Sequence, residues 1–400
     1  MNSPEKLFIR KQDDFFITSF WYQSRLLFYQ KYSTSELAPT KGDIYLGRIL
    51  SLENSLNAAF IDIGLDQPGF LDLQGYKKPI QRGEFIIVQI IRQAQGQKLI
   101  KLSPKIKFTG LSIIYLPEDK ILKISKNLKQ DSKALPIIDF VTQIKNQNEG
   151  LIIRRNAQTL ETDFILKEVN KFRDLWQTIQ NNKNLSKIGK LFDDGNHMWR
   201  ILRDQQGFFV DHIIISHRNL ISILQKELSF YYSLIEEKIL YQPSSHWVPN
   251  LTEEQEQLEQ ALNPYVELDS GKHLIIESNQ TLHTIDINAG VAPHHHDKDQ
   301  YFFKSNIETF AEIALQIRLR NLHGIIIIDT INISPKELKE KMMHIFKKMF
   351  ENDPSEIWIG HLSALGLIEM TRQYYGPTLK EQLTKICKKC DGLGYTSFEI

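Results

Sequence analysis

The chain has 400 residues, more than one hydrophobic core usually organises, so we expect several subdomains. Hydrophobic residues make up 42% and charged residues 24%. No apolar run approaches the roughly 20 residues of a membrane span, and residues 1–10 lack the pattern of an export leader. These features predict a cytoplasmic protein. The formal net charge is only +1, so a nucleic-acid-binding role requires locally concentrated Lys and Arg side chains.

The amino-terminal part of the chain divides into an aromatic, apolar segment and a region of short strands. Residues 1–40 carry aromatic and apolar runs, and a polar stretch, 33–41, then follows that is typical of a linker. Short β-branched runs divided by glycines follow. The expected strands are Asp43–Leu50, Ala58–Ile63, Gly69–Leu73, Glu84–Arg92 and Lys98–Leu102. Five short strands at this spacing predict a small closed barrel of the OB type.

The middle of the chain mixes strands with amphipathic helices. Residues 105–200 combine a lysine-rich strand region with a helix whose buried face recurs at steps of three and four: Ile165, Val169, Phe172, Trp176 and Ile179. An apolar strand is expected at Ile213–Ile215, and an acidic helix at Glu253–Leu262. We expect this acidic helix to partner the amino-terminal segment, because neither piece alone has enough apolar surface to form a domain.

From about residue 265 the pattern alternates strands and helices as in an α/β fold. The expected strands are Leu274–Glu277, Leu282–Ile287, Ile325–Ile328, Glu356–Ile359 and Leu367–Met370, and the expected helices are Ile307–Arg320 and Leu338–Phe350. The all-isoleucine run 325–328 predicts a fully buried strand. Ser334, Pro335 and Glu337 predict the start of the second helix, as N-cap, first-position proline and capping-box glutamate.

Two aspartates follow or end these strands and are candidate metal ligands. Residues two apart on a strand point the same way, so Asp286 and Asn288 share one face. Asp329 closes the isoleucine run, and the carboxyl ends of such strands are where α/β sheets place ligands. Two carboxylates plus waters suit Mg²⁺, which can activate water and stabilise charge on a phosphodiester. The alternative for each aspartate alone is a turn or cap residue.

The chain contains two cysteines, Cys387 and Cys390, in a Cys-x-x-Cys spacing. Gly392 and Gly394 follow them, which is the turn chemistry of a zinc knuckle. Tetrahedral Zn²⁺ requires four ligands, so a second chain would supply the other pair. A redox pair and two unconnected thiols are the alternatives.

Four motifs occur in the order of the ribonuclease E/G catalytic region, and the chain resembles that family over nearly its whole length. They are Thr284–Gly290, Arg318–Asp329, Gly366–Gln373 and Cys387-x-x-Cys390. The resemblance implies a multi-subdomain fold that mixes α+β and α/β parts. Its expected parts are an RNase H-like subdomain in two pieces (1–40 and 201–264), an inserted S1-type OB-fold RNA-binding domain (41–104), a 5′-sensor subdomain (105–200), a DNase I-like α/β catalytic subdomain (265–383) and a zinc link (384–400).

The resemblance also implies an activity. The family comprises hydrolases that cut single-stranded, AU-rich RNA internally and leave 5′-phosphate and 3′-hydroxyl ends. They act in RNA decay and in RNA processing, including the processing of ribosomal RNA. Carried over to this chain, Asp286 and Asp329 would hold a catalytic Mg²⁺, with Asn288 as a hydrogen-bonding support. Cys387 and Cys390 would bind a structural Zn²⁺ shared between the chains of a homodimer. The alternative from another class is an RNA-binding protein that keeps the barrel and does not cut.

Residues 41–49, 58–64 and 69–71 resemble the S1-type RNA-binding signature. Phe60 and Phe70 match family aromatics that pack on bases, and such stacking contributes roughly 1–3 kcal/mol per base. Lys98 is a candidate phosphate contact. The alternative is that both phenylalanines belong to the barrel core, since barrels bury alternate residues.

The chain departs from the family pattern at three places. Arg154 matches the phosphate-sensing arginine, but Arg155 stands where a threonine is expected, so we expect 5′-phosphate sensing with altered geometry. The chain ends ten residues after Cys390, without the small carboxyl-terminal domain of larger members, so a zinc-linked dimer is the largest assembly expected. His294–His296 stand where many relatives carry arginine and glycine; we interpret them as a polar loop, with adventitious metal binding as the alternative.

Overall fold

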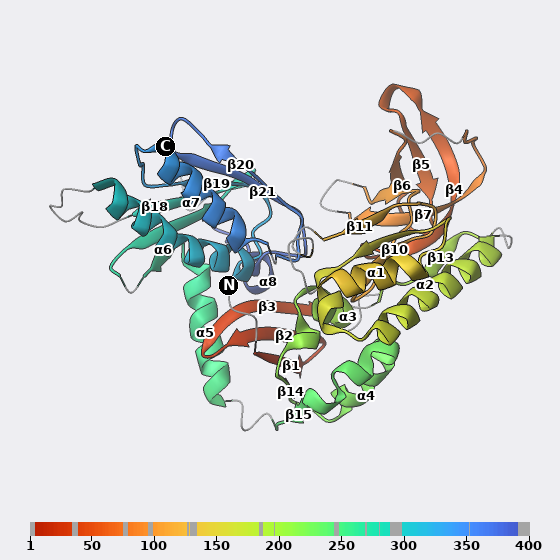
Figure 1. The fold of residues 1–400 in the computed structure, drawn as a ribbon, viewed down its shortest axis with the longest axis horizontal. Helices are drawn as coiled ribbons and strands as arrows, with labels where there is room; N and C mark the ends of the chain where they lie inside the picture. Colours follow the sequence, from red (N-terminus) through yellow and green to blue (C-terminus); the bar gives the residue numbers. More distant parts are fainter. Residues whose placement is uncertain are drawn as a thin grey trace. The chain divides into compact units, whose positions relative to one another are not determined.

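The computed structural model divides into two compact units, residues 1–35 with 204–400, and residues 36–203. It describes residues 5–33, 39–74, 79–94, 99–125, 128, 134–183, 187–195, 197–243, 248–268, 270–279, 281–288, 298–351 and 353–390. Both units mix helices with sheets, as predicted (Figure 1). None of the helices within these ranges is long and apolar enough to cross a membrane.

The first unit contains a five-stranded sheet built from segments far apart in the sequence. Its strand order is β15 (Ile239–Tyr241), β14 (His212–Ile215), β1 (Lys6–Gln12), β2 (Phe15–Tyr22) and β3 (Arg25–Ser33). Strand β1 pairs in parallel with β14, with Leu7 opposite Ile213. The amino-terminal segment is therefore completed by strands from beyond residue 204, and α4 (Asn219–Leu228) follows β14.

Helix α5 (Val248–Leu262) packs on this sheet, which confirms the predicted partnership between the acidic helix and the amino-terminal segment. Leu258 shares a core cluster with residues of β1, β2 and β3. The Glu254 carboxylate, almost fully buried, accepts hydrogen bonds from Arg10 Nη1 at 3.0 Å and Ser19 Oγ at 2.7 Å. A buried charge that is paired and hydrogen-bonded in this way joins the two segments by polar as well as apolar contacts.

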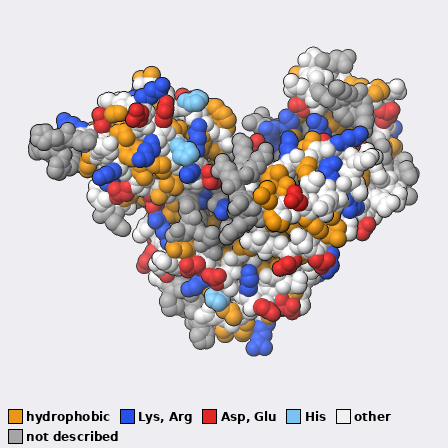
Figure 2. Space-filling model, in the orientation of Figure 1, with side chains coloured by type: hydrophobic (Ala, Val, Ile, Leu, Met, Phe, Trp, Pro, Cys, Tyr) orange, Lys and Arg blue, Asp and Glu red, His pale blue; other side chains and the backbone are white. Residues whose placement is uncertain are grey.

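A second, six-stranded sheet in the same unit carries the candidate catalytic residues. Its order is β16 (Tyr265–Glu267), β17 (His273–Ser278), β18 (Leu282–Asn288), β19 (Gly324–Asp329), β21 (Leu367–Arg372) and β20 (Ile357–Leu362). Helices α6 (Lys298–Leu319) and α7 (Lys336–Met349) pack on one face of it (Figure 1), and the short α8 (Leu379–Leu383) follows β21. On the side of this unit seen in Figure 2, acidic and basic side chains are interspersed, in keeping with the near-zero net charge.

The prediction that the strand at 325–328 is buried throughout is wrong. Ile326 and Ile328 are fully buried beneath α6 and α7, whereas Ile325 is 49% exposed. Successive side chains of a strand point to opposite faces, so the face turned away from these helices receives every second isoleucine. An uninterrupted apolar run predicts burial on both faces, and here only one face joins the core.

The two predicted helices of this region are confirmed, with different starting points. Helix α6 begins at Lys298 rather than Ile307. Its buried residues before Ile307 are Phe303, Ser305 and Asn306, so no regular apolar period marks this part of the helix. The predicted serine cap of α7 is wrong. Pro335 is the N-cap and makes no side-chain cap hydrogen bond, and the N–H of Ser334 donates to Asp299 Oδ1 at 2.8 Å. The residue before a proline is restricted to extended conformations, so Ser334 lies outside the helix.

The second unit contains the predicted closed five-stranded barrel. Its strands are β4 (Ile44–Glu53), β5 (Ala58–Asp62), β6 (Gly69–Asp72), β7 (Phe85–Arg92) and β8 (Lys101–Ser103). They pair in the order β4-β5-β6-β8-β7, β7 pairs back to β4, and β13 (Gly189–Phe192) adds to β4. Closure leaves few free strand edges, and the order is consistent with an OB-like subdomain.

A four-stranded sheet shares the second unit with the barrel. Its order is β11 (Leu122–Ile124), β12 (Gly150–Ile153), β10 (Ile113–Leu116) and β9 (Phe108–Thr109), and the helices are α1 (Leu135–Ile144), α2 (Thr162–Lys183) and α3 (His197–Asp204). The predicted buried face of α2 is confirmed, since all five of its apolar residues lie in one core cluster. Ile44 and Ile87 of the barrel join that cluster, so the barrel and this sheet share a core.

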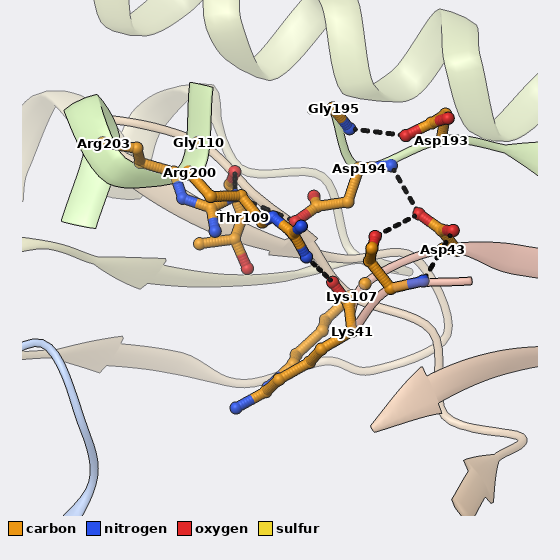
Figure 3. A network of polar contacts seen from close by, with 12 residues as sticks. Lys41, Asp43, Lys107, Thr109, Gly110, Asp193, Asp194, Gly195, Arg200 and Arg203 are labelled. Carbon is orange, nitrogen blue, oxygen red and sulfur yellow. Dashed lines mark hydrogen bonds and ion pairs between the residues drawn. The ribbon is translucent and has the colours of Figure 1, made fainter. Parts of the chain in front are cut away.

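A buried polar network ties the barrel entry to α3 (Figure 3). The fully buried Asp43 carboxylate accepts from the N–H of Thr40 at 3.0 Å and the N–H of Asp194 at 3.2 Å, and it lies 2.9 Å from Lys190 Nζ. Arg203 Nη1 in turn donates to Asp194 Oδ2 at 3.1 Å. Because each charge is both paired and hydrogen-bonded, the network fixes these segments relative to one another without leaving a buried charge uncompensated.

Candidate active site

Asp286 and Asp329 lie side by side at the ends of β18 and β19. The two strands are parallel, and Asp286 is the register partner of Asp329. Their neighbours Ile285 and Ile328 point into the core under the helices, so both aspartates lie on the opposite face. We call this surface, which carries Asp286, Asn288 and Asp329, the acid face.

Asn288 supports Asp286 directly. It follows two residues later on the same strand, and its Nδ2 donates to Asp286 Oδ2 at 2.6 Å. This hydrogen bond constrains the orientation of the Asp286 carboxylate. No Lys or Arg described in the structure lies within ion-pair distance of Asp286 or Asp329.

The donor chemistry of the pair fits a hard divalent cation. Parallel strands lie about 4.8 Å apart, so the register places two carboxylates, which are hard oxygen donors, on neighbouring strands. Half-buried Asp286 and exposed Asp329 can both turn oxygen atoms toward a shared ion while water completes its coordination. Mg²⁺ is bound in this way, through one or two carboxylates and several waters.

Phe60 and Phe70 form a pair on the outside of the barrel. They are opposite each other on β5 and β6, with ring centroids 6.0 Å apart and planes at 72°. Ala59, Ile61 and Leu71, the residues next to them, supply the barrel core, so the alternative that both phenylalanines are core residues is wrong. Both side chains are half-buried, so part of each remains in contact with solvent.

A second basic side chain lies beside this aromatic pair. Lys98 lies outside the described residues. Lys101 on β8, which sequence reasoning missed, is the register partner of Phe70 on β6, and its Nζ lies 3.3 Å from Asp72 Oδ2. The available signal was a lysine on the barrel strand next to the one that carries Phe70.

Arg154 and Arg155 follow β12 and have different surroundings. The N–H of Arg154 donates to the carbonyl of Ser112 at 2.8 Å, and its Nη1 donates to the carbonyl of Gly110. Arg155 begins a 3-10 turn and is exposed. Arg154 is thus held against the 110–113 loop, whereas Arg155 is exposed.

Glu168 holds that loop and was missed at the level of sequence. This fully buried carboxylate accepts from the N–H groups of Leu111 at 2.7 Å, Ser112 at 2.9 Å and Ile113 at 3.2 Å, and from Ser112 Oγ at 2.5 Å. The sequence feature that could have indicated Glu168 is its position: it lies three residues after Ile165, on the apolar face of α2. An acid in that position has to be matched by donors, because an unpaired buried charge is strongly unfavourable.

Cys387 and Cys390 lie in a turn after α8. Main-chain N–H groups of Lys389 and Cys390 lower the pKa of the exposed Cys387 thiol, and the Cys390 thiol adds to the effect. A lowered pKa favours the thiolate that binds metals. Within the described ranges, no cluster of three or more His, Cys, Asp or Glu side chains is arranged around a common metal position, so two thiols would need ligands from elsewhere.

Comparison with known proteins agrees with this arrangement of residues. The family model described as "Ribonuclease E/G family" matches residues 107–375, about two thirds of the chain. The chain belongs to the ribonuclease E/G family. Among its relatives, ribonuclease G of Escherichia coli (strain K12) is 26% identical over 374 residues, covering 88% of this chain and 76% of the relative. Ribonuclease E of Synechocystis sp. is 27% identical over 88% of this chain and 55% of its own length.

Membership of the ribonuclease E/G family confirms the resemblance, and the structure shows what its motif arginines do in this chain. The Asp353 carboxylate, fully buried, lies 3.1 Å from Arg318 Nε and 3.1 Å from Arg372 Nε. Arg372 Nη1 also donates to Asn321 Oδ1 at 2.9 Å, and Asn321 Nδ2 donates to the carbonyl of Gly376 at 2.9 Å. These motif residues anchor β19, β21 and α6 to one another and do not face the acid pair.

Other family positions predicted from the sequence lie outside the described residues. They are Ala289 and Gly290 of the aspartate motif, His294–His296, Gly392 and Gly394. Among the predicted site residues that the structure describes, Asp286, Asn288 and Asp329 come together in one place. Phe60 and Phe70 form a second place, and Arg154 a third.

Proposed function

We propose that this member of the ribonuclease E/G family is a magnesium-dependent endoribonuclease that cuts single-stranded, AU-rich RNA. The observation that carries the proposal is the register of Asp286 and Asp329, which sets two carboxylates side by side on the acid face without a described basic partner. The names of the relatives, ribonuclease G and ribonuclease E, support the same reaction class.

Asp286 and Asp329 would hold the ion, and a bound Mg²⁺ would supply activation of water and stabilisation of charge on the phosphate oxygens. Asn288 would orient the Asp286 carboxylate for metal binding through its 2.6 Å hydrogen bond. Because the acid face is the one turned away from α6 and α7, a phosphodiester can approach both aspartates from solvent. Cleavage would leave 5′-phosphate and 3′-hydroxyl ends.

The other predicted residues would bind the RNA around this reaction. Phe60 and Phe70 would stack on bases, with Lys98 as a phosphate contact, in a barrel of the S1 type. Arg154 would recognise a 5′-phosphate, with Arg155 replacing the threonine of the family pattern. The remaining parts would correspond to the RNase H-like, 5′-sensor and DNase I-like subdomains, with the boundaries given above.

Cys387 and Cys390 would bind Zn²⁺ together with the same two residues of a second copy, forming a zinc-linked homodimer. The lowered pKa of Cys387 supports metal binding over an inert thiol. Purified protein should then contain about one zinc ion per two chains, as four-ligand coordination requires. One zinc per chain, or a dimer that persists unchanged after chelation, would contradict this arrangement.

The test of the proposal is cleavage of a single-stranded, AU-rich oligonucleotide by Asp286→Asn and Asp329→Asn. We expect each variant to lose Mg²⁺-dependent product formation, because a metal held by two carboxylates loses an essential ligand, while RNA binding stays close to wild type. Glu337→Gln is a matched control, since this exposed acid lies on α7 at the other face of the sheet. Undiminished cutting by both aspartate variants would remove the mechanism.

The alternative function is RNA binding without cleavage. The same assay with the wild-type protein distinguishes it from the proposed endoribonuclease. That alternative expects RNA binding with no product at any Mg²⁺ concentration. We expect product with wild type and with Glu337→Gln.

A further inference from the structure

The acid face carries an aromatic residue in line with the two aspartates. Register partners run across four strands in one row: Tyr265 on β16, Ile275 on β17, Asp286 on β18 and Asp329 on β19. Register partners point to the same face, so the Tyr265 side chain lies on the same surface as the carboxylates. At about 4.8 Å per strand, its Cα lies roughly 10 Å from that of Asp286.

Tyr265 is exposed and is already stacked on one side. Tyr265 is 43% exposed although β16 is part of the sheet. The ring stacks on His273 of β17, with centroids 4.6 Å apart and planes at 26°. His273 is the register partner of Asn288, so the ring pair lies directly next to the residue that orients Asp286.

We propose that Tyr265 and His273 form a base-stacking subsite for an unpaired nucleotide flanking the cleaved bond. This inference rests on the proposed function, because it takes the acid pair as the place of cleavage. A tyrosine that is stacked on one face and open to solvent offers a flat π surface to a base, and such stacking tolerates any base. A base inside a duplex is already stacked and paired, so the subsite accepts only single-stranded RNA.

The charges around the ring pair favour a base over a phosphate as its ligand. Glu267 lies directly opposite His273 on β16 and is exposed on the same face. An acid at this position repels phosphate oxygens, so the contact made by the rings is with the uncharged base. The nucleotide's phosphate is left to be held elsewhere, on the side of the acid pair.

The experiment is an abasic scan with the intact protein. Single-stranded oligonucleotides with one abasic position each, stepped across the cleavage position, are titrated in buffer without divalent metal, so that binding is measured without cutting. With wild type, removing the base that occupies the subsite should weaken binding roughly 5- to 100-fold, the range for base–aromatic stacking. With Tyr265→Ala, we expect uniformly weaker binding and no further loss at that one position.

Two variants serve as controls. Tyr265→Phe keeps the ring and should bind within about twofold of wild type, which also shows that the site tolerates substitution. Trp358→Ala removes an aromatic residue that is 61% exposed on β20, opposite Thr371 and away from the row of aspartates. It should keep the position-dependent loss seen with wild type.

The proposal is overturned if the abasic scan has the same profile with Tyr265→Ala as with wild type, or if Trp358→Ala removes the same position-dependent loss. Both results are read from binding, so they do not depend on cleavage. Loss of cutting in wild type would instead remove the proposed function, while the binding scan would still report whether the rings stack on a base.

Discussion

Glu168 is a buried carboxylate on which the 110–113 loop depends, and replacing it with alanine should destabilise residues 36–203. Its two oxygens accept four hydrogen bonds, three of them from main-chain N–H groups of fully buried residues. In Glu168→Ala these three donors lose their acceptor in a region that water does not reach. The same loop holds Arg154 through the carbonyls of Ser112 and Gly110.

The size of the effect follows from these contacts. A buried donor left without a partner costs about 1–3 kcal/mol, and breaking a buried charged network typically costs about 3–5 kcal/mol. We therefore expect Glu168→Ala to reduce the free energy of unfolding by about 3–5 kcal/mol. For a unit of this size, 1 kcal/mol lowers the Tm by roughly 2–4 °C, so the transition that reports this unit should shift by roughly 6–20 °C.

The assay combines thermal unfolding of the intact protein with amide hydrogen exchange. Exchange should accelerate at the N–H groups of residues 111–113, because these are the groups that lose their acceptor. Glu161→Gln is the matched control, since Glu161 is exposed at the start of the same helix and should change stability by less than about 0.5 kcal/mol. A loss below about 1 kcal/mol in Glu168→Ala, with unchanged exchange in the loop, would refute the reasoning.

Two further predictions concern the first unit. Asp353→Asn should lower the free energy of unfolding by about 3–5 kcal/mol, because Arg318 and Arg372 lose their shared buried carboxylate; an unchanged urea midpoint would contradict this. Burial lowers the pKa of His283, whose Nε2 lies 3.0 Å from the carbonyl oxygen of His323. His283 of the unfolded chain therefore binds a proton at a higher pH than His283 of the folded chain. The free energy of unfolding should be at its full value above pH 6.5 and decline as the pH falls below it, and His283→Asn should flatten this decline.

Local patterns predicted the elements of this chain well where one period dominated. The α2 face at steps of three and four residues is buried as expected, because a helix can present such a stripe to only one neighbour. The barrel strands were equally clear, since glycines and β-branched runs mark each turn and strand. The division of the chain into six functional parts stays a prediction.

Burial on a particular face could not be predicted from the isoleucine run of β19. Whether Ile325 is covered depends on which elements pack on the sheet, and that is decided by segments remote in sequence. The sequence motifs had the same limit. They indicated Asp286 and Asp329 as site residues but did not indicate Tyr265 or His273. Those two residues become relevant only through strand pairing across β16 and β17.

Within the described residues, helices cover only one face of the six-stranded sheet, which explains why strand β19 can contribute residues both to the core and to a candidate site. Ile326 and Ile328 pack under the helices, and this burial fixes the strand on which Asp329 is carried outward. A fully covered sheet would bury the two aspartates and raise the free energy of their charged forms, which would weaken metal binding. The exposure of Ile325 therefore follows from the same geometry that leaves the two carboxylates on the face turned away from the helices. Covering the acid face with a tightly bound protein should accordingly block cleavage without unfolding the chain.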